Sequence, residues 1–171
     1  FSFDRDNVQI YLSDLRQGKV DEVNIVTAGG NYGWNLREAR FWFDSATGSL
    51  VQAPVRPPPA GMIDPIAQYD HDDGTATIGG YVYRGGAIPG LAGTYVFGDW
   101  GTFGAPSGRL FYLDETNGVK EFRIGHQDRP LGIWLKGFGQ GADGELYVFG
   151  SRWLGPSGNT GRMLKIVPVA D

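Results

Sequence analysis

"YVFGD" occupies residues 95–99 and "YVFGS" residues 147–151, and both align without gaps with "IYLSD" at residues 10–14. Val, Ile, Tyr and Phe fill most of these positions, which favours β-strands. After a loop, each stretch is followed by a second strand-like run, and these runs read "DEVNIV", "GRLFYLD" and "GRMLKIV". The sequence therefore predicts a β-hairpin that recurs three times along the chain.

The spacing of the three stretches indicates a repeat architecture. They begin 85 and 52 residues apart, and the longer interval contains the Pro-rich residues 53–65. An insertion of about 33 residues would account for the difference, and a period of roughly 40–50 residues with several strands is typical of propeller blades. We expect one all-β domain over residues 1–171, with about three blades and a Pro-rich insertion at about 40–66. A complete all-β sandwich is the alternative.

Composition narrows the classes of function. The 171 residues include 28 Gly and no Cys, and 13% are aromatic. Without Cys there is no disulfide, thiolate nucleophile or thiolate metal site. The net charge of −4 and the absence of a basic run argue against nucleic acid as a partner. No apolar run reaches the ~18 residues of a membrane span.

Three motifs, taken in order, resemble a known family. They are "GGNYGWN" at 29–35, "TIGGYVYRGGAIPGLAGTYVFGDW" at 77–100 and "DGELYV" at 143–148. Together they resemble the C-terminal half of the soluble sugar dehydrogenases that use pyrroloquinoline quinone (PQQ), and of their hedgehog-interacting-protein-like relatives. The resemblance implies half of a six-bladed β-propeller, completed by an N-terminal half or a partner chain. It also implies a sugar (aldose) substrate, PQQ and calcium as cofactors, and a periplasmic or secreted location.

The turn in "SDLRQGKVDEVN" (13–24) is the predicted metal site. In the family it resembles, backbone carbonyls of this turn hold the calcium ion, and matching outward from "DEVN" places Arg16 and Gln17 at those positions. Ca²⁺ prefers oxygen ligands of this kind. The alternative is an ordinary blade turn in which Asp14 accepts hydrogen bonds from backbone N–H groups.

The predicted cofactor-binding residues come from three further stretches. Tyr81 and Tyr83 alternate with Val82 and so should share one face of a strand. Trp100 stands where the related enzymes often have a Lys that pairs with PQQ carboxylates, and Lys136 is the nearest cation in a region that can supply an Arg. Because PQQ carries three carboxylates, several cations must converge on it. The other cations considered are Arg84, Arg109 and Arg152.

Two stretches remain open to a structural or a functional interpretation. The Asp-rich residues 70–73, with His71 among them, are either metal ligands or a solvated turn. The glycines and aromatics of "GGNYGWNLREARFWF" (29–43) either pack between blades or line the mouth of the propeller channel.

No catalytic residue is predicted in this chain. The family's general base is a His in the preceding half of the ring, and neither His71 nor His126 matches its motif. We therefore expect this chain to form one wall of the cofactor site of an aldose dehydrogenase and to be inactive alone. The alternative function is a non-catalytic propeller that binds a protein or a glycan.

Overall fold

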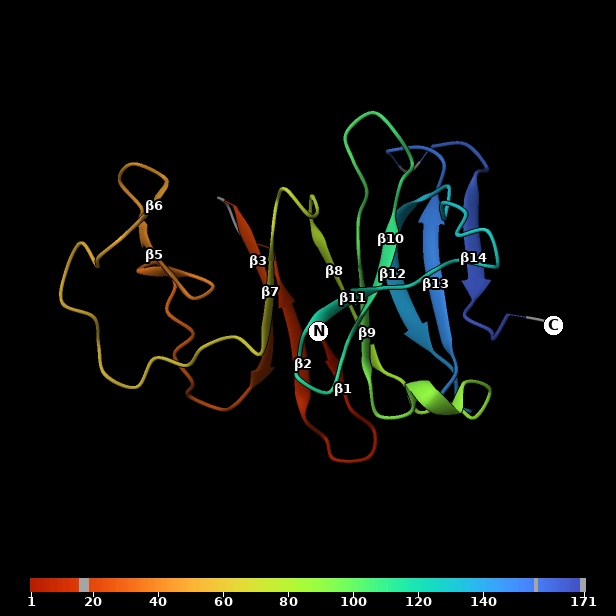
Figure 1. The fold of residues 1–171 in the computed structure, drawn as a ribbon, viewed down its shortest axis with the longest axis horizontal. Coiled ribbons are helices and arrows are strands. Elements are labelled where there is room, and N and C mark those ends of the chain that lie inside the picture. The colour runs from red at the N-terminus through yellow and green to blue at the C-terminus, as the bar shows by residue number, and fades with distance from the viewer. Residues whose placement is uncertain (16–18, 156, 170–171) are drawn as a thin grey trace.

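Strands make up nearly all the regular structure of the chain, seen here in a computed structural model that describes residues 1–15, 19–155 and 157–169 (Figure 1). They form four antiparallel sheets. The helical content of these ranges is one 3-10 turn, η1, at Pro89–Leu91. The predicted all-β class is confirmed.

Three of the sheets contain the repeated hairpins. The first sheet has the order β1 (Ser2–Phe3), β2 (Ile10–Asp14), β3 (Val20–Val26), β7 (Ala67–Asp70). The second has the order β8 (Thr77–Val82), β9 (Tyr95–Asp99), β10 (Arg109–Leu113), β11 (Val119–Glu121). The third has the order β12 (Trp134–Gln140), β13 (Leu146–Ser151), β14 (Gly161–Lys165). The aligned stretches are β2, β9 and β13, each the second strand of its sheet, so their predicted equivalence is confirmed.

The three sheets lie side by side, with the second between the other two (Figure 1). Its strand β8 contacts β1 and β2 on one side and β12 on the other. Apolar side chains fill both gaps: Tyr69, Phe97 and Phe111 are among those between the first and second sheets, whereas Leu135 and Val148 are among those between the second and third. Burial of these side chains holds neighbouring sheets together.

Gly80 allows a close approach of two backbones inside the second sheet. A Cβ atom at this position would overlap the carbonyl oxygen of Val96 on the neighbouring strand. The pairing of β8 with β9 shifts register between Ile78 and Tyr81, and the N–H of Gly80 donates to the Tyr95 hydroxyl at 3.1 Å. Gly80 therefore lies in a bulge where only a residue without a side chain fits.

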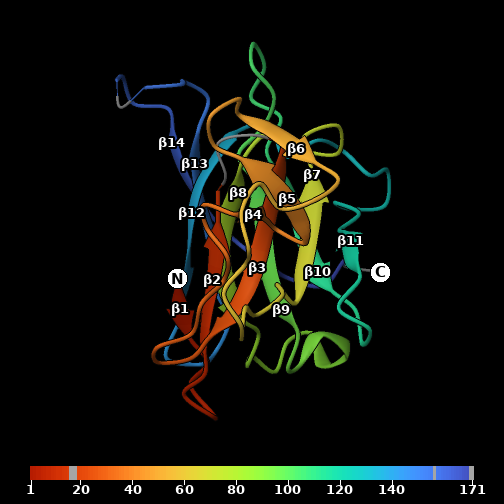
Figure 2. The same ribbon diagram turned by 90° about the vertical axis from the view of Figure 1, so that its left-hand side faces the viewer.

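The segment between β3 and β7 forms the fourth sheet. Its strands are β4 (Arg37–Glu38), β5 (Phe41–Asp44) and β6 (Ser49–Val51). Figure 2 shows this small sheet in front of the first sheet, on the side away from the second. The Pro-rich insertion predicted at about 40–66 falls within this segment.

Candidate functional site

The loops at one end of the three large sheets gather along the top of Figure 1, which we call the upper end. Thr77 pairs with Asp99, and Trp134 pairs with Ser151, so the loops that adjoin these residues lie at the same end. The first sheet reaches the same end at Asp21, whose carboxylate accepts the Thr77 N–H at 2.6 Å. The upper end therefore brings together loops that are distant in sequence.

Trp100 and Lys136, both predicted to bind a cofactor, meet at the upper end. The ammonium nitrogen of Lys136 lies 5.5 Å from the centroid of the Trp100 ring, which is a cation–π contact. The same nitrogen donates to the carbonyl oxygen of Leu154 at 2.7 Å. Two further rings flank Trp100, that of Phe103 at 5.4 Å and that of Trp134 at 6.3 Å. We call Trp100, Phe103, Trp134 and Lys136 the upper aromatic cluster.

Trp134 contributes an unused donor to this cluster. Its side chain is buried, and its indole N–H has no hydrogen-bond partner among the described residues. A buried donor without a partner costs about 1–3 kcal/mol. Because this nitrogen is itself buried, what the cluster offers to a ligand is aromatic faces and one cation.

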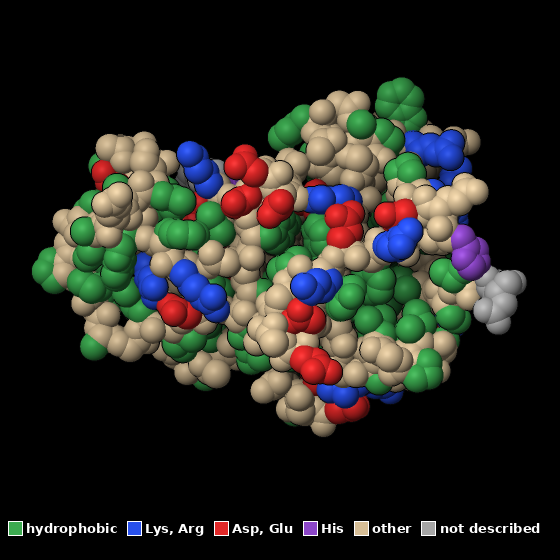
Figure 3. All heavy atoms as spheres, in the orientation of Figure 1, with side chains coloured by type: hydrophobic (Ala, Val, Ile, Leu, Met, Phe, Trp, Pro, Cys, Tyr) green, Lys and Arg blue, Asp and Glu red, His purple; other side chains and the backbone are tan. Residues whose placement is uncertain are grey.

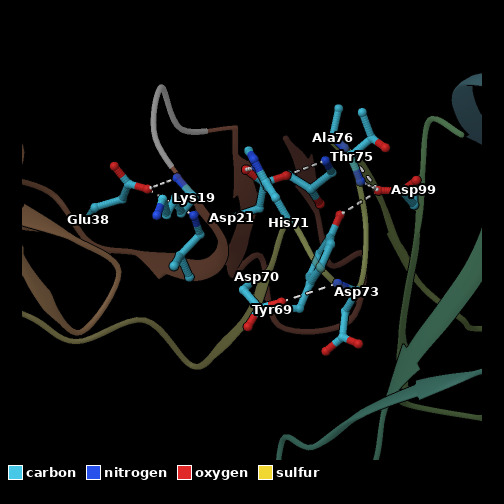
Figure 4. A network of polar contacts seen from close by, with 12 residues as sticks. Lys19, Asp21, Glu38, Tyr69, Asp70, His71, Asp73, Thr75, Ala76 and Asp99 are labelled. Atoms are coloured by element: carbon cyan, nitrogen blue, oxygen red, sulfur yellow. Dashed lines mark hydrogen bonds and ion pairs between the residues drawn. The ribbon is translucent and has the colours of Figure 1, made fainter. Parts of the chain in front are cut away.

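Backbone contacts fix the position of Trp100. Its N–H donates to the Ala76 carbonyl at 2.9 Å, and its own carbonyl accepts from Leu135 at 3.0 Å. The preceding residue, Asp99, is buried and accepts hydrogen bonds from four donors of three chain segments. Figure 4 shows Asp99 facing Tyr69 and the Thr75–Ala76 backbone. Sequence reasoning missed Asp99, although it ends the repeated motif "YVFGD".

Tyr81 and Tyr83 lie on the same side of their strand, as the alternation with Val82 predicts. Both pack in the core between the second and third sheets, whereas Val82 packs in the core between the first and second. Tyr83 is fully buried, and burial raises the pKa of its hydroxyl. That hydroxyl donates to Glu145 at 2.9 Å and accepts from the backbone N–H of Ile88 at 3.0 Å.

The structure separates Tyr83 from the upper aromatic cluster. Tyr83 follows the lower end of β8, seven residues after Ala76, which bonds to Trp100. At about 3.3 Å per residue this is roughly 20 Å along the strand. The predicted cofactor contact of Tyr83 is therefore remote from that of Trp100 and Lys136, and it stays a prediction.

The predicted calcium ligands Arg16 and Gln17 lie outside the described residues. Glu38 holds the base of their turn, because one of its carboxylate oxygens accepts the N–H groups of Lys19 and Val20 (Figure 4). Glu38 is fully buried and comes from the fourth sheet, which sequence reasoning did not connect to this turn.

The Asp-rich residues 70–73 form a turn. One oxygen of Asp70 accepts the N–H groups of Asp72 and Asp73, and the His71 ring lies 3.2 Å from Asp21. No group of three or more potential metal ligands is found within residues 1–15, 19–155 and 157–169.

Arg84 and Arg109 pair with carboxylates and do not converge on Lys136, whereas Arg152 lines a different cleft. The guanidinium of Arg84, which follows the end of β8 opposite Thr77, pairs with Asp4 at 2.6 Å, and this hydrogen bond is the main reason that the pKa of Asp4 is lowered. Arg109 pairs with Glu121 at 3.3 Å, at the outer edge of the second sheet. Lys136 is therefore the one cation that these contacts place in the upper aromatic cluster.

No helix in the described part of the chain is long and apolar enough to cross a membrane.

Solved structures of sugar dehydrogenases share this fold. A glucose dehydrogenase superposes with a TM-score of 0.64 at 20% identity, over 98% of this chain and 43% of that protein. The soluble aldose sugar dehydrogenase of Escherichia coli, solved in the apo-form, gives 0.60 at 20% identity, over 96% and 42%. Both are β-propellers, and this chain spans less than half of either.

Sequence comparison identifies the family of the chain, whereas the structural comparison shows only its fold. The HIPL2 and HIPL1 proteins of Arabidopsis thaliana are 35% and 31% identical over 107 residues, which is 57% of this chain and 15% of each relative. The model of the glucose/sorbosone dehydrogenase family matches residues 1–157. The resemblance noted from the motifs is thus confirmed at the level of the family, and the chain belongs to the glucose/sorbosone dehydrogenase family.

Proposed function

We propose that this chain forms one wall of the cofactor site in a PQQ- and calcium-dependent aldose dehydrogenase. The observation that carries the proposal is the meeting of Trp100 and Lys136 at the upper end. A flat, anionic cofactor needs an aromatic face and a cation, and these two residues offer both.

The described residues fit PQQ at two points. The Trp100 ring would lie against its ring system, and the Lys136 ammonium would approach one carboxylate. When bound, PQQ would supply a two-electron acceptor for the hydride of the sugar, and a calcium ion would supply polarisation of that acceptor. Family resemblance expects the backbone carbonyls of Arg16 and Gln17, which lie outside the described residues, to be the ligands of the ion.

The proton acceptor of this reaction lies outside the chain in our proposal. Family resemblance places a His general base in the preceding half of the ring, and in this chain His71 faces Asp21 instead. The role of these residues is therefore to bind and orient the cofactor, with Asp99 as the anchor that holds Trp100 in place.

Completion of the ring is part of the proposal. The third sheet has three strands where the first and second have four, and every residue of its last strand β14 is exposed. Phe1, Phe3 and Met163 are also more than half exposed. Apolar surface and an open strand edge of this kind are usually covered, so we expect an N-terminal half or a partner chain there. A periplasmic or secreted location belongs to the same proposal and rests on the family alone.

A non-catalytic binding module is the second candidate. It is favoured by the contacts of Arg84 and Arg109, which pair with carboxylates away from Lys136, whereas a cofactor with three carboxylates needs several cations. A protein or glycan would then be the ligand of the propeller.

The test is dye reduction with glucose and other aldoses in the presence of PQQ and Ca²⁺. We expect turnover by the full-length protein or complete assembly and none by this chain alone. Turnover by this chain alone would refute the proposed division between the two halves. If the complete assembly neither binds PQQ nor turns over any aldose, the binding module is the correct interpretation.

A further inference from the structure

A second cleft lies away from the upper aromatic cluster, between the outer parts of the first and second sheets. It has a volume of about 500 Å³, which is within the usual range of small-molecule sites. The lining residues that matter here are Phe41, Gln68, Asp70, Asp73, Arg109 and Glu121. In the space-filling view a hollow with acidic side chains on its rim lies near the middle of the molecule (Figure 3).

The charge of the cleft is negative. Asp70, Asp73 and Glu121 supply three carboxylates, and among the described lining residues Arg109 supplies the only cation. Arg109 is already committed, because it pairs with Glu121 at 3.3 Å and stacks on the Phe111 ring at 4.9 Å. The carboxylates of Asp70 and Asp73 are not neutralised by Arg109, so the electrostatic potential in the cleft favours a cationic ligand.

Asp73 is available to such a ligand. Its carboxylate accepts no hydrogen bond and forms no ion pair with the described residues, whereas its backbone N–H donates to Asp70. Figure 4 shows this carboxylate directed away from the contacts of Asp21, His71 and Asp99. Neither the fold nor the proposed cofactor site uses it.

The other walls of the cleft suit a ring that bears hydroxyl groups. Phe41, from the fourth sheet, offers an aromatic ring that is 46% exposed. The amide oxygen of Gln68 accepts the N–H of Arg40 at 3.1 Å, while its amide nitrogen donates to no described residue. An aromatic face, an amide donor and carboxylate acceptors together match a ligand whose hydroxyls both donate and accept.

We propose that this cleft binds a protonated amino sugar. The ammonium group would lie between Asp73 and Asp70, one face of the sugar ring would pack on Phe41, and the hydroxyls would bond to Gln68 and Glu121. The carboxylates would stabilise the ammonium group through charge-assisted hydrogen bonds, and the aromatic ring would cover the apolar face of the sugar. The site is separate from the upper aromatic cluster and does not depend on the proposed function.

The test is calorimetric titration of the full-length protein with the disaccharide of glucosamine. We expect saturable binding that weakens as salt is raised, because exposed charges are screened. The N-acetylated disaccharide has the same rings without the charge, and it should bind about two- to fivefold more weakly, as expected for the loss of one exposed ion pair. Asp73→Asn and Phe41→Ala should each weaken glucosamine binding about two- to fivefold.

Asp72→Asn is the matched control. Asp72 is an exposed neighbour in the same turn that does not line the cleft, so its substitution should leave the affinity unchanged. Three results would overturn the proposal: no saturable binding of the glucosamine disaccharide, an equal loss from Asp72→Asn and Asp73→Asn, or equally tight binding of a linear diamine. This experiment measures binding of the disaccharide and not turnover with PQQ. A negative result would therefore refute this proposal without bearing on the proposed function.

Discussion

Substitution of Asp99 should loosen the upper end, because this side chain holds together the loops that carry Trp100. One carboxylate oxygen accepts the Tyr69 hydroxyl at 3.2 Å and the N–H groups of Thr75 at 2.7 Å and Ala76 at 3.0 Å. The other accepts the Gly101 N–H at 3.0 Å. All four bonds are charge-assisted, and the Asp99 side chain is 1% exposed.

The loss of stability expected for Asp99→Asn follows from these four hydrogen bonds. An amide can keep its oxygen toward Thr75 and Ala76, but its nitrogen then faces the Gly101 N–H, which is donor against donor. One buried donor without a partner costs about 1–3 kcal/mol, and the three remaining bonds lose their charge assistance. We therefore expect the free energy of unfolding to fall by about 2–4 kcal/mol. Asp99→Ala leaves four donors without partners and should cost more.

Urea unfolding of the full-length protein, followed by tryptophan fluorescence, measures this change. Asp72→Asn is the control: it removes the same charge from an exposed turn and should change the stability by less than about 0.5 kcal/mol. The near-ultraviolet circular dichroism of Asp99→Asn should also weaken, because Trp100 is less firmly held. A loss of less than about 1 kcal/mol for Asp99→Asn would refute the reasoning.

Three further predictions concern the lower end and the second sheet. Tyr83→Phe removes a hydroxyl with two buried hydrogen bonds and should lower the free energy of unfolding by about 1–3 kcal/mol in urea. Gly80→Ala should prevent folding or cost more than about 4 kcal/mol, because its Cβ overlaps neighbouring backbone, whereas Gly86→Ala has open space and should cost little in the same assay. Because the folded-state pKa of Asp4 is lowered, chiefly by its hydrogen bond from Arg84, its contribution to stability is present above about pH 4 and lost as pH falls through the folded value. Unfolding curves for Asp4→Asn should show less acid destabilisation than the unsubstituted protein, and equal pH profiles would contradict this assignment.

The repeated hairpins could be predicted because their apolar and aromatic residues alternate with few interruptions. β12 was missed, since Gly137 and Gly139 in "WLKGFGQ" are typical of a loop. In the structure a register shift lies between Leu135 and Gly137, and the Phe149 ring approaches Gly139 so closely that a Cβ would meet it at 2.9 Å. Such glycines mark positions where a neighbouring strand approaches closely. This contact cannot be predicted from the residues of one strand before its partner strand is known.

The site was predictable only in part, for a similar reason. Trp100 and Lys136 could be proposed from motif positions, and the fold places them in contact. Glu38 could not be connected to the turn at Lys19, because the contact joins a two-residue strand of the fourth sheet to a hairpin 18 and 19 residues away. The burial of Tyr83 could not be predicted from the sequence either. The alternation of residues along a strand shows that Tyr81 and Tyr83 share a face, but the same alternation results whether that face lines a channel or packs in a core.

Titration of the full-length protein with PQQ in the presence of Ca²⁺ tests the central proposal most directly. We expect saturable quenching of tryptophan fluorescence and about tenfold weaker binding for Lys136→Ala, because one charge-assisted contact of ~1.4 kcal/mol is lost. Lys120→Ala, which removes an exposed cation that pairs with Asp114 at 3.5 Å, should bind PQQ as the unsubstituted protein does. Absence of saturable binding, or equal affinities for Lys136→Ala and Lys120→Ala, would contradict a cofactor site at the upper aromatic cluster.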